Sequence, residues 1–315
     1  MAPRLTHADT RPPPVPEGFA VGRAGAHHGE ILQGLWWPDC SAAVEPVPCL
    51  VTLPVSGVGS EAHFKPAPGA AICVVPSWKT KAACAARVAL DALNAGNCGG
   101  ILRLHGSIPT GLGLGSSTSD VLASLRAVYA AIGAPANADT LARLAVRAEV
   151  ASDPLMFDGA VLFAQRDGRV LEHWGEWLPD FLLLSVDTDP QAGGRDTLSV
   201  PRPNHAATRA HYTELLRSAR AAFRARDAVA VAAVATRSAD LHQHIAPTRS
   251  YRALRAVSAA SGALGLQIAH SGTVAGVLFD PRSSAETLRT VISQLGTLRM
   301  TVRGLLRTGV AAARA

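Results

Sequence analysis

The sequence predicts a two-domain α+β protein, and three observations support this fold class. The chain has 315 residues, a length that suggests roughly two domains. Stretches with helical spacing of apolar residues are interspersed with short β-branched runs along the whole chain. In the last third the expected order is helix, strand, strand, helix, strand, which suits an α/β sandwich of ferredoxin type. We place a disordered, proline-rich leader at residues 1–18, a first domain at 19–179 and a second at 180–315.

The first domain is expected to mix strands with three helices. Residues 19–34 predict a hairpin, in which a short strand enters a small-residue turn and a second strand follows Gly29-Glu30. Elsewhere apolar β-branched runs predict strands, and apolar residues three and four apart predict helices. The expected strands are 49–54, 70–76, 101–105, 160–165 and 169–174, and the expected helices are 77–93, 117–132 and 139–150.

The second domain is expected to begin with a very apolar, central strand at 181–186. The polar, glycine-rich segment 187–203 is either a plain linker or a mobile loop that closes over substrate. His242 and His244 are expected on the surface or as helix caps. The remaining expected elements are helices at 204–226, 227–242, 249–261 and 284–295, a strand-turn-strand unit at 264–279 and a last strand at 297–302.

Composition limits the class of protein. With 48% hydrophobic and 17% charged residues, the chain is typical of a soluble globular protein. The net charge is +6, but the arginines are scattered, which favours mild attraction for anions such as nucleotides over nucleic-acid binding. Five cysteines without a Cys-x-x-Cys pair suggest neither a zinc site nor a disulfide framework, so a cytoplasmic location is expected. We expect no signal peptide and no membrane span, because no apolar run is long enough.

The glycine- and serine-rich stretch from Pro109 to Asp120 is the segment of the sequence that is most informative about function. It joins an expected strand to an expected helix, and Ser117 and Asp120 have the spacing of a capping box, so the helix should start at Ser117. Alternating glycines let the backbone turn its N–H groups outward, and a helix N-terminus adds unsatisfied donors and partial positive charge. The ordinary alternative is a tight strand-to-helix turn. Four hydroxyl residues at 116–119 favour a phosphate site, because hydroxyls can also ligate a phosphate-bound Mg²⁺.

Other nucleotide-binding motifs are absent from the sequence. There is no Gly-Lys pair for a Walker loop, and the glycine spacing is not that of a dinucleotide fingerprint. The chain has only three lysines and no His-Arg-Asp or Asp-Phe-Gly motif, which argues against a protein kinase.

The run Pro-x-Gly-Leu-Gly-Leu-Gly-Ser-Ser resembles the second signature of the GHMP small-molecule kinases. Two further segments resemble the same family. Gly29-Glu30 and the following Ile-Leu-Gln-Gly resemble the end of its first signature, as found in the L-threonine kinase branch of cobalamin biosynthesis and propanediol utilisation. That branch has Ser-Cys where this chain has His27-His28. The turn at 271–276 resembles the third signature. The resemblance implies a ribosomal-S5-domain-2-like N-terminal domain and a ferredoxin-like C-terminal domain.

The resemblance also implies site residues. Asp153 lies in a segment similar to the one that supplies the family's catalytic base, although a turn aspartate before proline is the commoner explanation; Asp158 is the reserve candidate. Ser117 and Glu149 are expected to ligate Mg²⁺. The ATP phosphates are expected at Pro109, Gly111, Leu112, Gly113, Leu114, Gly115, Ser116, Ser117 and Thr118. The acceptor is expected at His28, Glu30, Gln33, Ser271, Gly272 and Thr273.

The implied function is ATP-dependent phosphorylation of the side-chain hydroxyl of a small amino acid, with L-threonine as the expected acceptor and O-phospho-L-threonine and ADP as products. Homoserine, serine or a non-proteinogenic hydroxy amino acid are alternative acceptors. A non-catalytic ATP-binding regulator on the same fold is an alternative of another class. A serine hydrolase is a third reading, but the chain lacks Gly-x-Ser-x-Gly. We expect a monomer or homodimer with no nucleic-acid or membrane partner.

Overall fold

The computed structural model describes residues 14–38, 45–108, 114–190, 205–270 and 272–309, with side chains from residue 208 in α4. Helices and strands are mixed along the chain, which confirms the predicted α+β class. The helices are α1 (Thr80–Ala92), α2 (Ser116–Ile132), α3 (Ala138–Glu149), α4 (His205–Ala225), α5 (Ala228–His242), α6 (Tyr251–Ala260) and α7 (Ala285–Thr297). No helix in these ranges combines the length and apolar composition needed to cross a membrane.

Ten strands of the described chain join in one sheet, in the order β10-β7-β9-β8-β1-β2-β4-β3, with β5 paired to β2 and β6 paired to β5. All neighbours are antiparallel except β3 and β4. The strands are β1 (Ala20–Trp36), β2 (Val47–Pro68), β3 (Ile72–Val75), β4 (Cys98–Gly106), β5 (Ala160–Ala164), β6 (Arg169–Gly175), β7 (Leu182–Asp187), β8 (Gly265–Ile268), β9 (Val274–Phe279) and β10 (Thr301–Arg307).

The predicted hairpin at 19–34 is wrong, because β1 runs unbroken through this segment. Its small residues serve packing instead of a turn: a Cβ on Gly22 would lie 2.1 Å from the carbonyl oxygen of Ala123 in α2. Gly29 has φ +56° and lies where the register with β2 shifts, so it introduces a bulge and the strand continues. The neighbouring strand β2 is also much longer than the predicted 49–54, since it pairs with β1 and then with β4.

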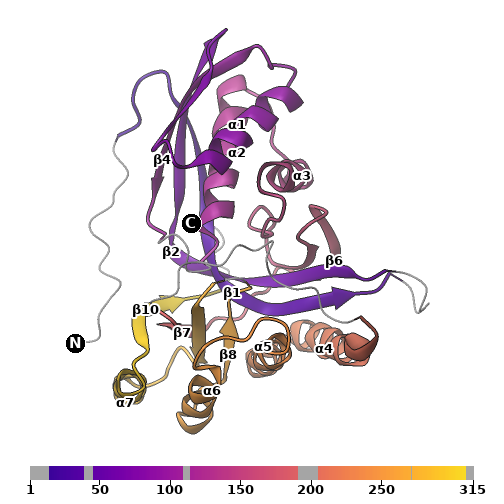
Figure 1. Ribbon diagram of the computed structural model, residues 1–315, viewed down its shortest axis with the longest axis vertical. Coiled ribbons are helices and arrows are strands. Elements are labelled where there is room, and N and C mark those ends of the chain that lie inside the picture. Colours follow the sequence, from indigo (N-terminus) through magenta and orange to yellow (C-terminus); the bar gives the residue numbers. More distant parts are fainter. Residues whose placement is uncertain (1–13, 39–44, 109–113, 191–204, 271, 310–315) are drawn as a thin grey trace.

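Helices α1, α2 and α3 pack together beside β2 and β4 (Figure 1). The predicted apolar face of α2 is buried, with Val121, Leu122, Leu125 and Val128 fully inaccessible. The predicted capping box is wrong. The helix begins at Ser116 after Gly115 and has no side-chain cap, while the Asp120 carboxylate pairs with Lys79 and accepts a hydrogen bond from Ser60.

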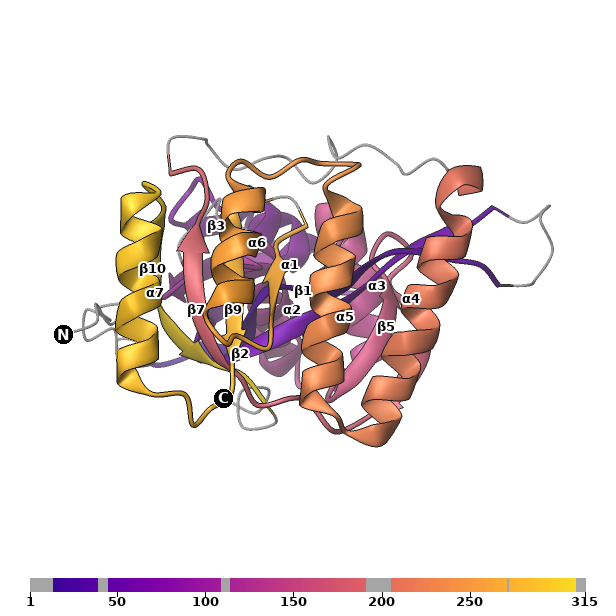
Figure 2. The same ribbon diagram turned by 90° about the horizontal axis from the view of Figure 1, so that it is seen from below.

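The C-terminal strands form the other part of the sheet, and α4, α5, α6 and α7 lie in a row along one side (Figure 2). The expected central place of β7 is confirmed, since it pairs with β10 and β9. The last strand was predicted too early, at 297–302. Residues Leu298 to Met300 instead close α7 through backbone hydrogen bonds to its last turn, and Arg299 adopts φ +59° there. His244 is exposed as expected, but His242 is buried, with its ring against that of His270.

Strand β1 links the two parts of the sheet. Along one edge it pairs with β2, and on the other Glu30 pairs with Ile268 of β8. The candidate site lies at this junction, where the N-terminus of α2 and the segment after α3 also meet β1.

Candidate active site

The N-terminus of α2 brings backbone N–H groups to the surface of β1. Gly115 precedes the helix with φ +69°, a conformation that favours glycine. A Cβ at this position would lie 2.1 Å from Cδ2 of His27 in β1. The absence of a side chain therefore allows the start of the helix to contact the His27 imidazole. The first N–H groups of a helix have no intrahelical partner and carry partial positive charge. The arrangement suits an anion such as a phosphate.

Glu149, at the end of α3, faces this helix start. Ser117 Oγ donates to its Oε2 at 2.6 Å, and Thr118 Oγ1 to its Oε1 at 2.8 Å. The carboxylate is buried, which raises its pKa to about 7 although the hydroxyl hydrogen bonds act in the opposite direction. Lys81 Nζ, 3.9 Å away, is the nearest side-chain cation of the described chain to this carboxylate. Glu149 and Ser117 thus form an oxygen pair that lacks a closely bound cation.

Asp153 lies next to Thr118 in the segment that follows α3. Its Oδ2 is 2.9 Å from Nε2 of His27 and 3.0 Å from Oγ1 of Thr118. The Thr118 hydroxyl carries one hydrogen, so it is shared between Glu149 and Asp153. His27 is therefore the principal donor to Asp153, whose side chain is 21% exposed at the edge of the cluster.

His27 and Asp153 shift each other's pKa in opposite directions. Burial on its own would lower the pKa of His27, but the charge and hydrogen bond of Asp153 raise it to about 9. Its Nδ1 lies 3.3 Å from the Gly29 carbonyl oxygen, so both ring nitrogens can donate, as an imidazolium requires. Burial would likewise raise the pKa of Asp153, and the His27 charge holds it below its ordinary value. The pair is an ion pair near neutral pH.

Glu30 is the second acidic group beside His27. Its Oε1 lies 3.8 Å from His27 Nδ1, and its buried Oε2 has no hydrogen-bond partner in the described chain. Burial raises the pKa of Glu30 well above its ordinary value, with His27 opposing the shift. Ligand atoms of His27, Glu30 and Asp153 lie within 4.8 Å of one another, a spacing that could hold a metal ion. A protonated His27 cannot be a ligand, so the geometry favours an ion-pair network here.

His28 contacts different partners from His27, and its expected role at the acceptor remains a prediction. The side chain is fully buried on the other side of β1, where Nε2 donates to Ser185 Oγ at 2.7 Å and Nδ1 accepts from the Gln267 amide. Burial and the nearby His27 charge lower the pKa of His28 to about 3, so its ring is neutral. Adjacent side chains of a strand point to opposite faces, and only the structure shows that His27 is the one that meets Asp153.

Gln33 lies on the side of the candidate site that is nearer the C-terminal strands. Its Oε1 accepts from His270 Nδ1 at 2.8 Å, and its buried Nε2 has no partner among the described residues. Burial lowers the pKa of His270, and the charge of Asp153 opposes that shift, so His270 lies within electrostatic range of the catalytic candidate. The sequence placed His270 in the turn expected at the acceptor, but it did not predict the contact with Gln33, because a histidine at a strand end has no distinguishing pattern.

The structure describes some of the other predicted site residues and not the rest. Thr273 is buried; its carbonyl accepts from Thr188, and its own hydroxyl has no partner in the described chain. Gly272 lies beside it in a bend, and Asp158 is exposed five residues after Asp153. Leu114 and Ser116 are described at the start of α2. The predictions at Pro109, Gly111, Leu112, Gly113 and Ser271 fall outside the described residues.

Comparison with known proteins relates the chain to one family. The model of the GHMP kinase N-terminal domain matches residues 80–158, which include α2, Glu149 and Asp153. The L-threonine kinase of Salmonella typhimurium (strain LT2) is 25% identical over 267 residues, 84% of each chain. The chain is therefore similar to the GHMP kinases. It is an enzyme of the class that phosphorylates small molecules with ATP, as the sequence predicted.

Solved structures show that the chain also has the fold of these kinases. A homoserine kinase from Cytophaga hutchinsonii superposes with a TM-score of 0.69 at 14% identity, over 93% of this chain and 95% of that one. The L. major mevalonate kinase in complex with R-mevalonate gives a TM-score of 0.63 at 17% identity, over 94% and 96% of the two chains. The predicted GHMP kinase fold is thereby confirmed, while the predicted domain boundaries remain predictions.

Proposed function

We propose that this enzyme transfers the γ-phosphoryl group of ATP to the side-chain hydroxyl of a small hydroxy amino acid, with L-threonine as the first candidate. The relationship to the L-threonine kinase of Salmonella typhimurium supports this acceptor class. The observation that carries the proposal is the ionised Asp153, held by His27 next to the N-terminus of α2. An acceptor hydroxyl at Asp153 would face a phosphate bound at the helix start.

The phosphates of ATP would be held by the backbone of the glycine-rich stretch and the first turn of α2, at Gly115, Ser116, Ser117 and Thr118 and the preceding residues from Pro109. Open N–H groups at a helix N-terminus provide this site without charged side chains. Phosphoryl transfer asks a protein mainly for positioning and charge stabilisation, and this arrangement supplies both.

Mg²⁺ fits the oxygen pair of Ser117 and Glu149. Hydroxyl and carboxylate oxygens are ligands that this ion takes. Burial raises the pKa of the Glu149 carboxylate, and the nearby Asp153 charge adds to this shift. When bound, the ion would neutralise charge on the β- and γ-phosphates. Lys81 would add a weaker, more exposed positive charge on the same side.

Asp153 would orient the acceptor hydroxyl and take its proton late in the transfer. A carboxylate whose pKa is below its ordinary value is a weak base, so early proton removal is unfavourable. The loose transition state of phosphoryl transfer requires little early deprotonation. His27 would keep Asp153 ionised and fix its rotamer. Gln33, His270 and Thr273 would line the acceptor side. Gln33 Nε2 and Thr273 Oγ1 are buried there and have no hydrogen-bond partner among the described residues.

The proposal is tested by measuring ADP release with L-threonine, L-serine, L-homoserine, mevalonate and sugars in turn, and by identifying the product by ³¹P NMR. We expect the highest kcat/KM for L-threonine and a phosphate-ester signal from O-phospho-L-threonine. Release with mevalonate or a sugar alone would refute the acceptor class. ATP binding without release for any acceptor would instead support the non-catalytic regulator.

A further inference from the structure

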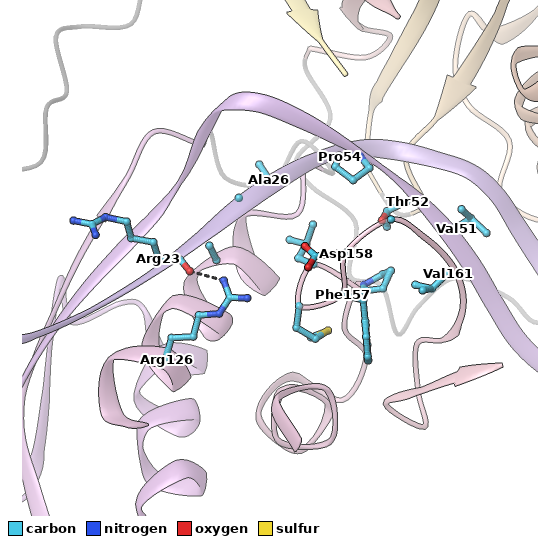
Figure 3. A pocket seen from close by; sticks show the side chains of 15 residues that line it. Arg23, Ala26, Val51, Thr52, Pro54, Arg126, Phe157, Asp158 and Val161 are labelled. Carbon is cyan, nitrogen blue, oxygen red and sulfur yellow. Dashed lines mark hydrogen bonds between the residues drawn. The ribbon is translucent and has the colours of Figure 1, made fainter. Parts of the chain in front are cut away.

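A cavity of about 270 Å³ lies beside β1, and Pro154, the residue after Asp153, is part of its lining. One wall is formed by β1 and β2 and includes Val51 and Thr52, and the opposite wall is formed by α2 and the segment after Asp153. Figure 3 shows Arg126, Asp158, Phe157 and Val161 around this space. The volume lies just below the usual range for ligand pockets, about 300–1,000 Å³, so it suits a small metabolite and is too small for a nucleotide.

The cavity is separate from the phosphate end of α2. Thr118, which contacts Asp153, and Arg126, which lines the cavity, are eight residues apart on the same helix. With a rise of 1.5 Å per residue, they lie roughly 12 Å apart along its axis. Neither Asp153 nor His27 lines the cavity, although their chain neighbours Pro154 and Ala26 do.

Arg126 offers unused hydrogen-bond donors to this cavity. Its Nη1 donates to the Arg23 carbonyl at 2.6 Å, which holds the side chain in place (Figure 3). Within the described chain no carboxylate lies within ion-pair distance of its guanidinium. Arg23 lines the same cavity, but its own guanidinium pairs with Glu61 at 2.6 Å. Arg126 is thus a fixed cation with free N–H groups, which suits a carboxylate.

Asp158 is the acidic group of the same cavity. Its carboxylate makes no hydrogen bond or ion pair with any described residue, and it lies close enough to Arg126 to counter the lowering of the Arg126 pKa by burial. The lining also includes apolar side chains, among them Val51, Met156 and Val161. Positive, negative and aliphatic surfaces therefore meet in one small cavity.

We propose that this cavity binds an α-amino acid zwitterion with a small aliphatic side chain, whose carboxylate pairs with Arg126 and whose ammonium group pairs with Asp158. The site is distinct from the acceptor site, and the proposal does not depend on which acceptor the kinase uses. The ligand would rest on residues 154–158, which continue directly from Asp153.

The test is titration calorimetry of the full-length protein with L-valine, which has no hydroxyl to phosphorylate, in the absence of ATP. L-Valinamide, which lacks the carboxylate, and 3-methylbutyrate, which lacks the ammonium group, are the matched probes. We expect a saturable L-valine site that neither probe fills. Arg126→Gln and Asp158→Asn should each weaken this site by at least about tenfold, as expected for loss of a charged hydrogen-bond partner.

Arg143→Gln, which changes an exposed arginine of α3, and Asp153→Asn are the controls, and both should leave this site unchanged. If L-valine also fills the acceptor site, two binding events should fall to one in the Arg126 and Asp158 variants. Asp158 is exposed, so Asp158→Asn tests the site even if Arg126→Gln unfolds. The proposal would be overturned if L-valine did not bind at concentrations up to about 10 mM. It would also be overturned if binding were lost in Asp153→Asn but kept in both cavity variants.

Discussion

The imidazole of His27 lies 2.9 Å from the Asp153 carboxylate and joins the middle of β1 to the segment after α3. The two residues are 126 positions apart in sequence. Because each shifts the pKa of the other, the protonation of one controls the chemistry of the other.

Replacing Asp153 with asparagine should lower kcat by about 10²- to 10⁴-fold, because the acceptor hydroxyl loses its proton acceptor. ATP binding should persist, since Asp153 is not part of the backbone site. Steady-state ADP release and nucleotide titration check the two halves of this prediction. Asp167→Asn, at an exposed turn, is the matched control. Full turnover in the Asp153 variant would remove this residue from the mechanism.

His27→Gln should change the pH dependence of kcat on both sides. In the wild type, kcat should fall on the acid side only at low pH, because His27 lowers the pKa of Asp153. On the alkaline side, kcat should fall as His27 loses its proton near pH 9. Without the cation, burial raises the pKa of Asp153, so the acid limb should move upward and the fall near pH 9 should vanish. pH–rate profiles of the wild type, His27→Gln and the exposed His244→Gln control provide the check. Superimposable profiles would show that the ion pair has no catalytic role.

The same pair should make stability depend on pH. The pKa of His27 rises from 6.5 to about 9 on folding, so its contribution is fully present below about pH 6.5 and is lost as pH rises through about 9. The loss amounts to up to about 3 kcal/mol of the free energy of unfolding. Urea denaturation at pH 6 and pH 9.5 measures it. His27→Gln should have a smaller change between these pH values, and an equal change would contradict the assignment.

Removing the oxygen pair should weaken the use of Mg²⁺. Glu149→Gln and Ser117→Ala are each expected to raise the Mg²⁺ concentration needed for half-maximal activity, because each loses one ligand oxygen. In the wild type, apparent Mg²⁺ affinity should increase as pH rises through about 7, where Glu149 ionises, and Glu149→Gln should lack this increase. Mg²⁺ titrations of ADP release at pH 6 and pH 8 measure both effects. An unaltered Mg²⁺ dependence in both variants would count against the proposed ligands.

Gly115→Ala should inactivate the enzyme, because its Cβ would lie 2.1 Å from the His27 ring. Gly133, at the other end of α2, has a similar positive φ of +74° but open space around the missing Cβ. Gly133→Ala should therefore show only the backbone cost, about 1 kcal/mol, with kcat retained. Thermal melting and ADP release separate the two variants. Equal activity in both would mean that His27 can move aside without harm.

Sequence reasoning was most successful where burial alone determines the pattern. The apolar spacing of α2 identified a helix whose inward face is buried, and the very apolar β7 lies in the interior of the sheet as predicted. These patterns depend on local periodicity, which is visible in a sequence.

The errors have a common physical cause in long-range contacts. The small residues of β1 indicated a turn, yet Gly22 is small because α2 packs on it. The Ser117–Asp120 spacing indicated a cap, yet Asp120 is used by Ser60 and Lys79. The pairing of His27 with Asp153 depends on which face of β1 meets α3, and a bulged strand does not reveal this. The roles of Asp153 and Glu149 came from family resemblance and remain predictions.

Strand β1 has a mechanical consequence for turnover. It carries His27, Glu30 and Gln33 on one backbone and is hydrogen-bonded to β2 along one edge and to β8 along the other (Figure 1). Rotation of one half of the molecule against the other would have to bend β1 or break its pairing with β8 at Glu30 and Ile268. The enzyme should therefore bind its substrates with little relative rotation of the two halves. The distances between the His27 imidazole, the Glu30 carboxylate and the Gln33 amide should stay constant from one catalytic cycle to the next.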